Sequence, residues 1–403
     1  MRRKHPPETT LWMAQTVASG MRVWYHWLGG QTGLGEDRRW RQAGRDFFRW
    51  QARHDSHFTY RRSLANLGVV FAQRPNAYYK PPGANAARGG DTPEFAQGLY
   101  STLLEGRFNF DLVHEDDLGP ETLRSYTALI LPNVALLGDG QCRQLRAYVE
   151  AGGSLLATFE TGLYDETCAP RADFGLSNLF GISRAGDVQG PIGQSYYARI
   201  ERPHEIMRGF SDTNWIPGAE YRVPVKAVDH TPVLTVVPAY TGYPPEMAYA
   251  RPAARTDEPA VVIRERGASR LIYFPGDIER SAWRSGNTDV SQLLQNSVRW
   301  LLRDRMPVTV EGEGFVELFA WETDPGYAVH ILNYNNPNLH RGWIRRNYPI
   351  GRQVVKMEVP GGRRIARVQL LRAEREIPFT QKGARVEFIV PSVTDYEVAA
   401  LST

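Results

Sequence analysis

LILPNVALLGDGQCRQLRAYVEAGGSLLATFETGLYDE, residues 129–166, predicts half of an open α/β sheet. Its first apolar run, Tyr126–Pro132, is short and does not alternate, which suits a parallel strand covered on both faces. Asp139 can cap the amphipathic helix that follows, and residues 152–153, Gly-Gly, predict a left-handed stop before a second buried strand, Ser154–Phe159. Such a unit crosses over right-handed, so both strands end at one carboxyl edge, where sites normally lie.

Carboxylates follow the predicted strands at this edge. Glu160 and Asp165 come after one strand, and Asp277 comes after a further apolar run, Arg270–Pro275. Clusters of this sort usually cap helices, and Asp277 could bind backbone amides of residues 281–286, although a catalytic carboxylate is the alternative. Other acidic residues in comparable positions are Glu115, Asp116, Asp117, Glu166 and Glu279.

No cofactor is expected. A metal site from His114, Asp116 and Asp277 lacks the spacing of a known ligand motif. No GxGxxG follows the predicted strand Asn66–Ala72, and residues 138–140, Gly-Asp-Gly, lack the third glycine that a dinucleotide site needs. We therefore expect neither a metal nor a nucleotide cofactor.

The turn after the second strand lacks a nucleophile but contains a recognisable short sequence. Neither Cys nor Ser stands at a strand-to-helix elbow, because Cys142 lies inside the helix and Cys168 in a later polar loop. The segment Thr161–Glu166, TGLYDE, resembles the Ser/Thr-Gly-x-x-Asp-Glu sequence of the β-galactosidase trimerisation domain, a catalytically silent form of the class I glutamine amidotransferase-like fold. The resemblance implies a homo-oligomer, with a trimer favoured, whose domain adds walls to neighbouring active sites.

The N-terminal segment predicts helix, strand, loop and helix, with the strand at Met21–Trp27. It resembles the end of a (β/α)8 barrel, and the resemblance implies that an aromatic residue at the end of the eighth strand lines the sugar site. Trp24, Tyr25, His26 and Trp27 match that position, and alternation allows only one pair to face inward. The alternative is that all four pack between barrel and following domain.

The resemblance leaves the catalytic residues unknown. Glycosidases of this kind use two carboxyl groups, which the barrel supplies from its fourth and seventh strands. If residues 21–27 are the eighth strand, both carboxyl groups lie upstream of Met1. We therefore expect most of the catalytic barrel to be absent from this chain.

From Pro307 onward the apolar pattern has period two and predicts six strands, typical of a β-sandwich. They are Phe315–Trp321, Gly326–Asn333, Val354–Val359, Ile365–Leu371, Arg385–Val390 and Asp395–Leu401. The predicted domains are thus a barrel remnant (1–62), a flavodoxin-like, amidotransferase-like open parallel sheet (63–304) and a β-sandwich (305–403).

Length, composition and charge limit the kinds of protein that this chain can be. The 403 residues, 42% of them apolar, suffice for two or three cores, and no apolar run approaches the roughly 20 residues of a membrane span. Residues 1–62 carry 12 Arg and Lys against five Asp and Glu, but Arg41, Arg45, Arg49 and Arg53 form one helical stripe. That stripe favours a solvated or domain-contacting face over nucleic acid binding. Without a clear signal peptide we expect a cytoplasmic protein, and a secreted parent protein is the alternative.

Two functions remain open. The first is the C-terminal assembly and accessory region of a β-galactosidase-like glycoside hydrolase, not catalytic alone, acting on carbohydrate only in the complete protein. The second is an independent hydrolase or amidotransferase-like enzyme at the sheet edge. It would need Cys168 as nucleophile and His114, His204 or His230 as base, and no spacing favours any pairing.

Overall fold

The computed structural model describes residues 5–25, 39–84, 92–192, 197–238, 256–335 and 344–403. The chain forms two compact units. The β-rich unit comprises residues 1–65, 107–109 and 306–403, and the α/β unit comprises residues 66–106 and 110–305. Within the described ranges no helix is long and apolar enough to cross a membrane.

The α/β unit is built on a six-stranded sheet in the order β3-β2-β4-β5-β12-β11. Pairing is parallel throughout except between β12 and the edge strand β11. The prediction of a mainly parallel sheet is therefore confirmed. The strands are β2 (Leu67–Phe71), β3 (Asp111–His114), β4 (Ala128–Leu131), β5 (Ser154–Thr158), β11 (Val262–Arg266) and β12 (Ser269–Phe274).

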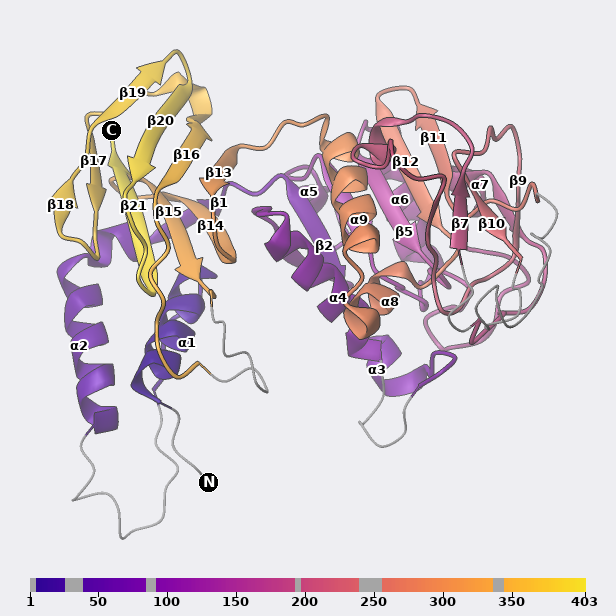
Figure 1. The fold of residues 1–403 in the computed structure, drawn as a ribbon, viewed down its shortest axis with the longest axis horizontal. Coiled ribbons are helices and arrows are strands. Elements are labelled where there is room, and N and C mark those ends of the chain that lie inside the picture. The colour runs from indigo at the N-terminus through magenta and orange to yellow at the C-terminus, as the bar shows by residue number, and fades with distance from the viewer. Residues whose placement is uncertain (1–4, 26–38, 85–91, 193–196, 239–255, 336–343) are drawn as a thin grey trace, which may run out of the picture. The chain divides into compact units, whose positions relative to one another are not determined.

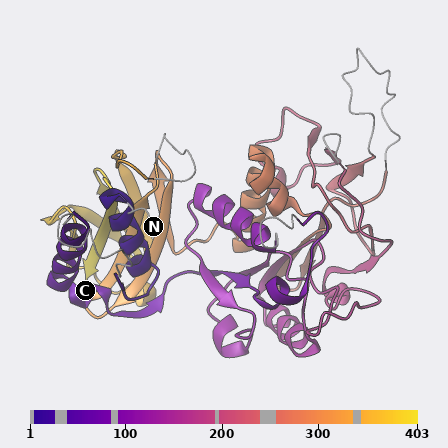
Figure 2. The ribbon, with the colours of Figure 1, turned by 90° about the horizontal axis from the view of Figure 1, so that it is seen from below.

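Helices cover both faces of this sheet (Figures 1 and 2). On one face α9 packs against β4, β5 and β12 and is joined by α4 and α8, while α6 and α7 lie on the other. Layers on both sides explain why the parallel strands read as unbroken apolar runs. The helices are α3 (Arg74–Tyr78), α4 (Thr92–Glu105), α5 (Pro120–Leu123), α6 (Asp139–Glu150), α7 (Ser177–Phe180), α8 (Ile278–Ser285) and α9 (Thr288–Leu302).

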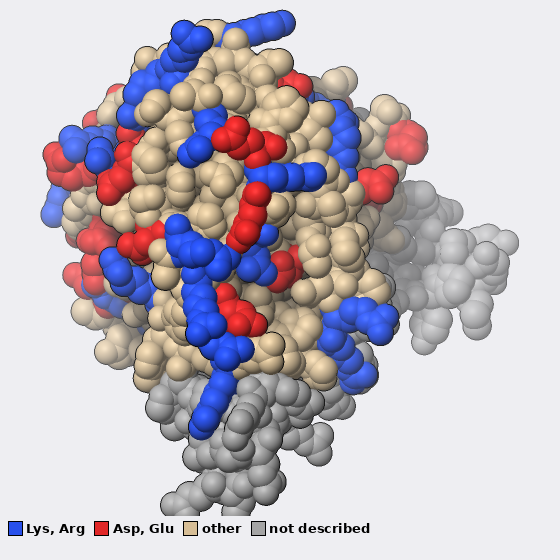
Figure 3. Space-filling model, turned by 90° about the vertical axis from the view of Figure 1, so that its left-hand side faces the viewer, with Lys and Arg blue, Asp and Glu red and all other residues tan. Residues whose placement is uncertain are grey.

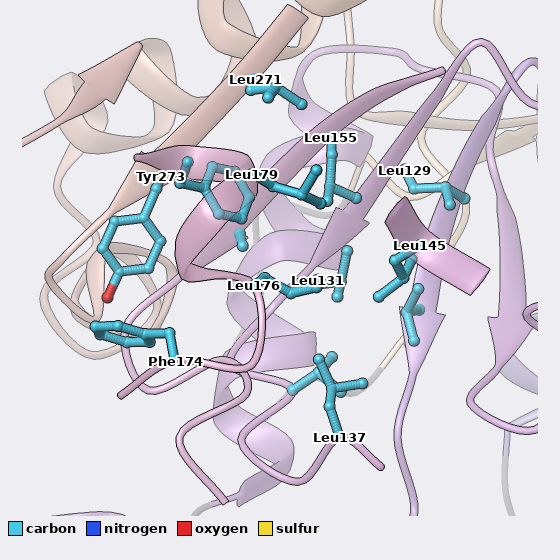
Figure 4. Close-up of a cluster of buried hydrophobic side chains, with 14 of the residues drawn as sticks. Leu129, Leu131, Leu137, Leu145, Leu155, Phe174, Leu176, Leu179, Leu271 and Tyr273 are labelled. Carbon is cyan, nitrogen blue, oxygen red and sulfur yellow. The ribbon is translucent and has the colours of Figure 1, made fainter. Parts of the chain in front are cut away.

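One core fills the space between the sheet and helices α6 and α7 (Figure 4). Leu129, Leu131 and Leu155 point from the strands toward Leu145 of α6, and all four are fully buried. Burying one such side chain contributes about 1.5–3 kcal/mol. This core holds β4 and β5 side by side, so the residues that follow them meet at one edge.

Helix α6 begins one residue earlier than predicted. Gly138, not Asp139, is the N-cap, and its N–H donates to the Gln141 side chain at 2.8 Å. Asp139 instead pairs with Arg171 at 2.7 Å. The predicted stop is confirmed, since Gly152 has a φ of +101°.

Two small antiparallel sheets extend the α/β unit. One pairs β6 (Ile182–Arg184) with β9 (Val225–Ala227). The other has the order β10-β7-β8, with β7 (Tyr197–Ile200), β8 (Trp215–Pro217) and β10 (Leu234–Val237).

The β-rich unit contains two antiparallel sheets around a shared apolar core. The first has the order β1-β14-β15-β21-β17-β18 and the second β13-β16-β20-β19. All six predicted strands are present, whereas β1, β13, β18 and β19 were not predicted. The strands are β1 (Tyr60–Ser63), β13 (Val308–Gly312), β14 (Val316–Thr323), β15 (Gly326–Asn333), β16 (Gln353–Glu358), β17 (Arg367–Leu370), β18 (Arg375–Glu376), β19 (Phe379–Lys382), β20 (Arg385–Val390) and β21 (Tyr396–Ser402).

The N-terminal helices α1 (Pro6–Ala18) and α2 (Arg39–Arg53) belong to the β-rich unit. Leu11 and Phe47 are buried in a cluster that includes Leu332 of β15 and Val398 of β21. Helices α1 and α2, which lie in the segment predicted to be the end of a largely absent barrel, therefore pack against apolar residues of the β-rich unit. The assignment of this segment to the end of a barrel stays a prediction.

Helix α2 presents its basic stripe on the outer side, and basic side chains follow this face (Figure 3). Arg45 and Arg49 are exposed, while Trp50 is buried and donates its indole N–H to the carbonyl of Leu371 at 3.0 Å. Arg53 pairs with Glu374 at 2.6 Å. The stripe is thus the polar face of an amphipathic helix.

Candidate functional site at the sheet edge

The chain turns sharply where β5 ends. Phe159 has a φ of +50°, which is rare for a bulky residue, and its side chain is fully buried. Its N–H donates to the carbonyl of Phe274 at 2.8 Å, and its own carbonyl accepts from the Tyr273 hydroxyl at 2.5 Å. These bonds hold the left-handed turn, which places a phenyl ring where an elbow enzyme would place its nucleophile.

Glu160 follows this turn and points into the protein. Its carboxylate accepts hydrogen bonds from the hydroxyls of Tyr79 and Tyr164, the latter at 3.2 Å, and it is only 2% exposed. Its backbone N–H donates to the Asn133 side-chain oxygen at 3.1 Å. Burial raises the pKa of Glu160, and the two tyrosine hydrogen bonds partly offset that rise.

A chain of hydrogen bonds continues from Asn133. Its N–H donates to the Thr158 hydroxyl at 2.9 Å, which donates to Glu279 at 2.5 Å. The second carboxyl oxygen of Glu279 is buried and has no hydrogen-bond partner among the described residues. Burial raises the pKa of Glu279 to about 8, so this carboxyl group is mainly neutral at pH 7.

Asp277 and Arg280 form a fully buried ion pair with a nitrogen–oxygen distance of 2.5 Å. Asp277 also accepts from the N–H of Tyr221 at 2.8 Å, and burial raises its pKa to about 6 despite Arg280. Arg280 donates to the carbonyl of Pro82 at 2.8 Å, and its guanidinium lies 4.7 Å from the centre of the Phe95 ring. The Asp277 carboxylate accepts from the Ser281 hydroxyl at 3.2 Å and not from the predicted amides of residues 281–286. The Ser281 N–H donates to the backbone carbonyl of Asp277 at 2.9 Å, as the first bond of helix α8.

The structure thus brings together an edge cluster of seven residues: Tyr79, Asn133, Thr158, Glu160, Asp277, Glu279 and Arg280. Asp165 is not part of it. Its carboxylate accepts from the N–H groups of Thr167 and Ala169 at 2.8 and 2.9 Å, so it stabilises its own turn. These bonds, the Thr167 hydroxyl first, lower the pKa of Asp165.

The carboxyl groups of the edge cluster lie in the protein interior, since Glu160, Asp277 and Glu279 are each no more than 2% exposed. The cavity beside the edge cluster, lined in part by Ala72, Pro132 and Asn133, holds about 20 Å³, which admits a single water molecule. Apart from the second oxygen of Glu279, the carboxyl groups of the edge cluster bond hydroxyls, a backbone amide and one guanidinium. In the described part of the chain, no group of three His, Cys, Asp or Glu side chains is placed to hold a metal ion.

The remaining predicted site residues lie elsewhere. Residues 21–25 form no strand, Trp24 is 82% exposed and Tyr25 is half-buried, whereas His26 and Trp27 fall outside the described residues. The alternation argument therefore does not hold over residues 21–25. Contact of these aromatic residues with a sugar stays a prediction.

The candidate nucleophile has no base beside it in the described structure. The thiol of Cys168 donates to the carbonyl of Tyr78 at 3.3 Å. His204 accepts from the N–H of Ile206 and packs on Trp300, and His114 lies 3.7 Å from Asp116. His230 lines a separate pocket.

Sequence reasoning named Glu160 and Asp277 but not their partners. Glu279 appeared only among the further acidic residues, and Arg280 and Tyr79 were missed. One signal could have found Arg280: it follows Asp277 by three residues at a predicted strand end, the spacing at which side chains pair on a helix. Nothing local indicates that Tyr79 reaches Glu160.

Residues 65–183 match the profile of the β-galactosidase trimerisation domain. No curated protein matches the sequence. Among solved structures, similarity extends to α-L-fucosidase isoenzyme 2 from Paenibacillus thiaminolyticus, with 20% identity and a TM-score of 0.73 over 99% of this chain and 58% of that one. β-Galactosidase from Bacillus circulans sp. alkalophilus has 13% identity and a TM-score of 0.68, over 99% and 52%.

A GH42 β-galactosidase from G. stearothermophilus gives 15% identity and a TM-score of 0.66, over 99% of this chain and 51% of that one. This chain therefore spans between 51% and 58% of the length of these three structures. At such identities the likeness is one of fold. Residues 65–183 thus match the β-galactosidase trimerisation domain, and the chain shares its fold with part of a group of glycoside hydrolases.

Proposed function

We propose that this chain is the assembly and accessory region of a carbohydrate-active glycoside hydrolase, β-galactosidase-like, and that it does not catalyse glycoside hydrolysis alone. The observation that carries the proposal is the burial of the edge cluster. Phe159 takes the elbow position, and the carboxyl groups of Glu160 and Asp277 are buried and bonded within the protein. Carboxyl groups that are buried and bonded in this way stabilise a sheet edge and are not presented to a substrate.

The finer fold assignment supports the same proposal. Numbered along the chain, the five parallel strands have the spatial order 2-1-3-4-5, which is the order of flavodoxin-like sheets. We infer an amidotransferase-like sheet that has lost its nucleophile, followed by a β-sandwich. We further propose that residues 1–62 are the end of a (β/α)8 barrel. In that case Trp24 and Tyr25 would line a sugar site only in a protein that contains the rest of the barrel.

The catalytic part of the proposal is tested with a panel of nitrophenyl glycosides that includes galactosides and fucosides. We expect no turnover above background from the purified chain. Turnover that disappears in Glu160→Gln or Asp277→Asn, while Asp165→Asn retains it, would overturn the proposal. Asp165 is the matched control because its carboxylate bonds only its own loop.

The assembly part concerns self-association. We expect a homo-oligomer, with a trimer favoured by the match to the trimerisation domain, and a stable interface needs about 1,000 Å² or more. Light scattering across a concentration series measures the mass directly. A strictly monomeric species at tens of micromolar would overturn the assembly role while leaving the catalytic result unaffected.

The alternative, an independent hydrolase or amidotransferase-like enzyme, rests on Cys168 alone. Its thiol bonds a backbone carbonyl, and no described histidine contacts it. If alkylation of Cys168 abolished a hydrolase activity but Cys168→Ser retained it, the added alkyl group would be obstructing a site and Cys168 would not be the nucleophile. Loss in both would favour the alternative.

A further inference from the structure

Two exposed aromatic side chains lie beside the edge cluster. Tyr78, at the end of α3, is 69% exposed and Trp283, on α8, is 45% exposed. The other large apolar side chains that are exposed in the described part of the α/β unit are Leu112 on β3 and Val228 just after β9. A single exposed apolar residue is ordinary on a protein surface, so the surroundings of each residue decide what it indicates.

The segment of residues 79–84, here called the strap, follows α3 and is fixed to α8, which carries the exposed indole (Figure 1). Arg280 donates to the carbonyl of Pro82 at 2.8 Å, and Arg284 donates to the carbonyl of Gly83 at 3.3 Å. Two guanidinium groups of one helix therefore hold successive carbonyls of the strap.

The start of the strap is fixed as well. The carbonyl of Tyr78 accepts from the Cys168 thiol at 3.3 Å, and the hydroxyl of the buried Tyr79 donates to Glu160. The backbone beneath the exposed Tyr78 ring is thus ordered before any partner arrives. A surface that is already ordered loses less conformational entropy when it associates.

The charges beside Trp283 are already paired. Arg284 forms ion pairs with Glu94 at 2.7 Å and with Glu220 at 2.9 Å. Covering this surface therefore leaves no guanidinium charge without a partner, which is the costly event when a charged surface is buried. Lys80 is the exposed charge of the strap and suits the polar rim of an interface.

We propose that the surface around the strap, with Tyr78 and Trp283 as its aromatic anchors, is one side of the contact between copies of this chain. The inference rests on the proposed assembly function and names the surface that carries it. The expected occupant is a second copy, because Tyr78 and the strap lie within residues 65–183, which match the β-galactosidase trimerisation domain. Interfaces draw most of their binding energy from a few side chains, in which Trp, Tyr and Arg are enriched.

The test is light scattering across a concentration series, with the full chain and four single variants. Tyr78→Ser and Trp283→Ser remove the anchors, whereas Leu112→Ser and Val228→Ser are matched controls that remove exposed apolar side chains elsewhere on the same unit. We expect the midpoint concentration for assembly to rise at least about 10-fold in each anchor variant, as for the loss of a hot-spot side chain, and to stay unchanged in the controls. Far-UV circular dichroism checks that each variant is folded.

Hydrogen exchange gives a second readout that needs no substitution. Exchange in peptides that cover residues 74–84 and 278–286 should slow as the parent chain assembles, whereas a peptide that covers residues 225–230 should not change.

Folded anchor variants that assemble at the same concentrations as the parent chain would overturn this inference and leave the proposed assembly function standing. Equal weakening in the control variants would also overturn it, because the contact would then not be specific to the strap. A parent chain that is strictly monomeric at tens of micromolar would overturn both.

Discussion

His330, in the middle of β15, should make the β-rich unit sensitive to acid. The imidazole is fully buried, with Nδ1 2.5 Å from the Tyr396 hydroxyl and Nε2 3.4 Å from the Tyr60 hydroxyl. Burial lowers its pKa from 6.5 to about 3. The perturbation is His330→Gln, which keeps a polar side chain at this position but removes the titration.

The sign and size follow from proton linkage. Between pH 6.5 and about 3 the unfolded chain binds a proton at His330 that the folded unit does not, so the free energy of unfolding falls as the pH drops through this window. At about pH 4.5, two units below the unfolded value, the loss is about 3 kcal/mol, since each unit corresponds to about 1.4 kcal/mol. His330→Gln should lack this loss whatever its stability at pH 7.

Hydrogen exchange followed by mass spectrometry, on peptides that cover residues 326–333, measures the local opening free energy at both pH values. His5→Gln, which removes an exposed histidine, is the control and should behave as the parent protein. The reasoning is refuted if His330→Gln loses as much stability between pH 7 and 4.5 as the parent protein loses. Equal losses would mean that His330 accepts its proton in the folded state at an ordinary pH.

Two further predictions concern the α/β unit. Glu279 has its pKa raised from 4.5 to about 8, so its contribution to stability is complete below pH 4.5 and is lost as the pH rises to 8. Urea unfolding at pH 5 and 8.5 should show a loss of roughly 4 kcal/mol in the parent protein that Glu279→Gln lacks, and an equal loss in both would contradict the assignment. Gly98→Ala should lower the thermal midpoint, because a methyl group there overlaps the backbone oxygen of Glu279. Gly140→Ala, where the nearest atom to the added methyl group is 3.8 Å away, should raise the free energy of unfolding by about 0.5–1 kcal/mol. Equal thermal midpoints for the two variants would argue against the close packing of α4 on α8.

Local patterns determined the regular elements. Val, Ile and Leu runs with period two produced β15 and β20 over the predicted ranges, and the 3.6-residue spacing with Gly152 produced the body and end of α6. β20 buries alternate residues as its pattern specifies, whereas all eight residues of β15 are buried. The position of Glu160 and Asp277 after strand ends was predictable for the same reason, because parallel strands deliver their ends to one edge.

The sequence RVWYHW shows where local pattern misleads. Its aromatic residues have high β propensity, and a strand was predicted at Met21–Trp27, yet residues 21–25 are irregular beside α1. A strand needs a neighbouring backbone to pair with, and the strands of the adjacent sheet are already paired with one another. Propensity describes a residue, whereas pairing depends on the rest of the fold.

Tertiary structure alone decided the chemistry of the edge. Arg280 reads from sequence as a solvated charge, yet it is buried against Phe95 because α8 starts directly under the sheet edge with Asp277 as its partner. Tyr79 reaches Glu160 across 81 residues of sequence. Because Glu160 and Asp277 are buried and bonded to residues distant in sequence, they stabilise the sheet edge instead of acting as catalytic acids. Neither their burial nor their distant partners can be read from the few residues around them.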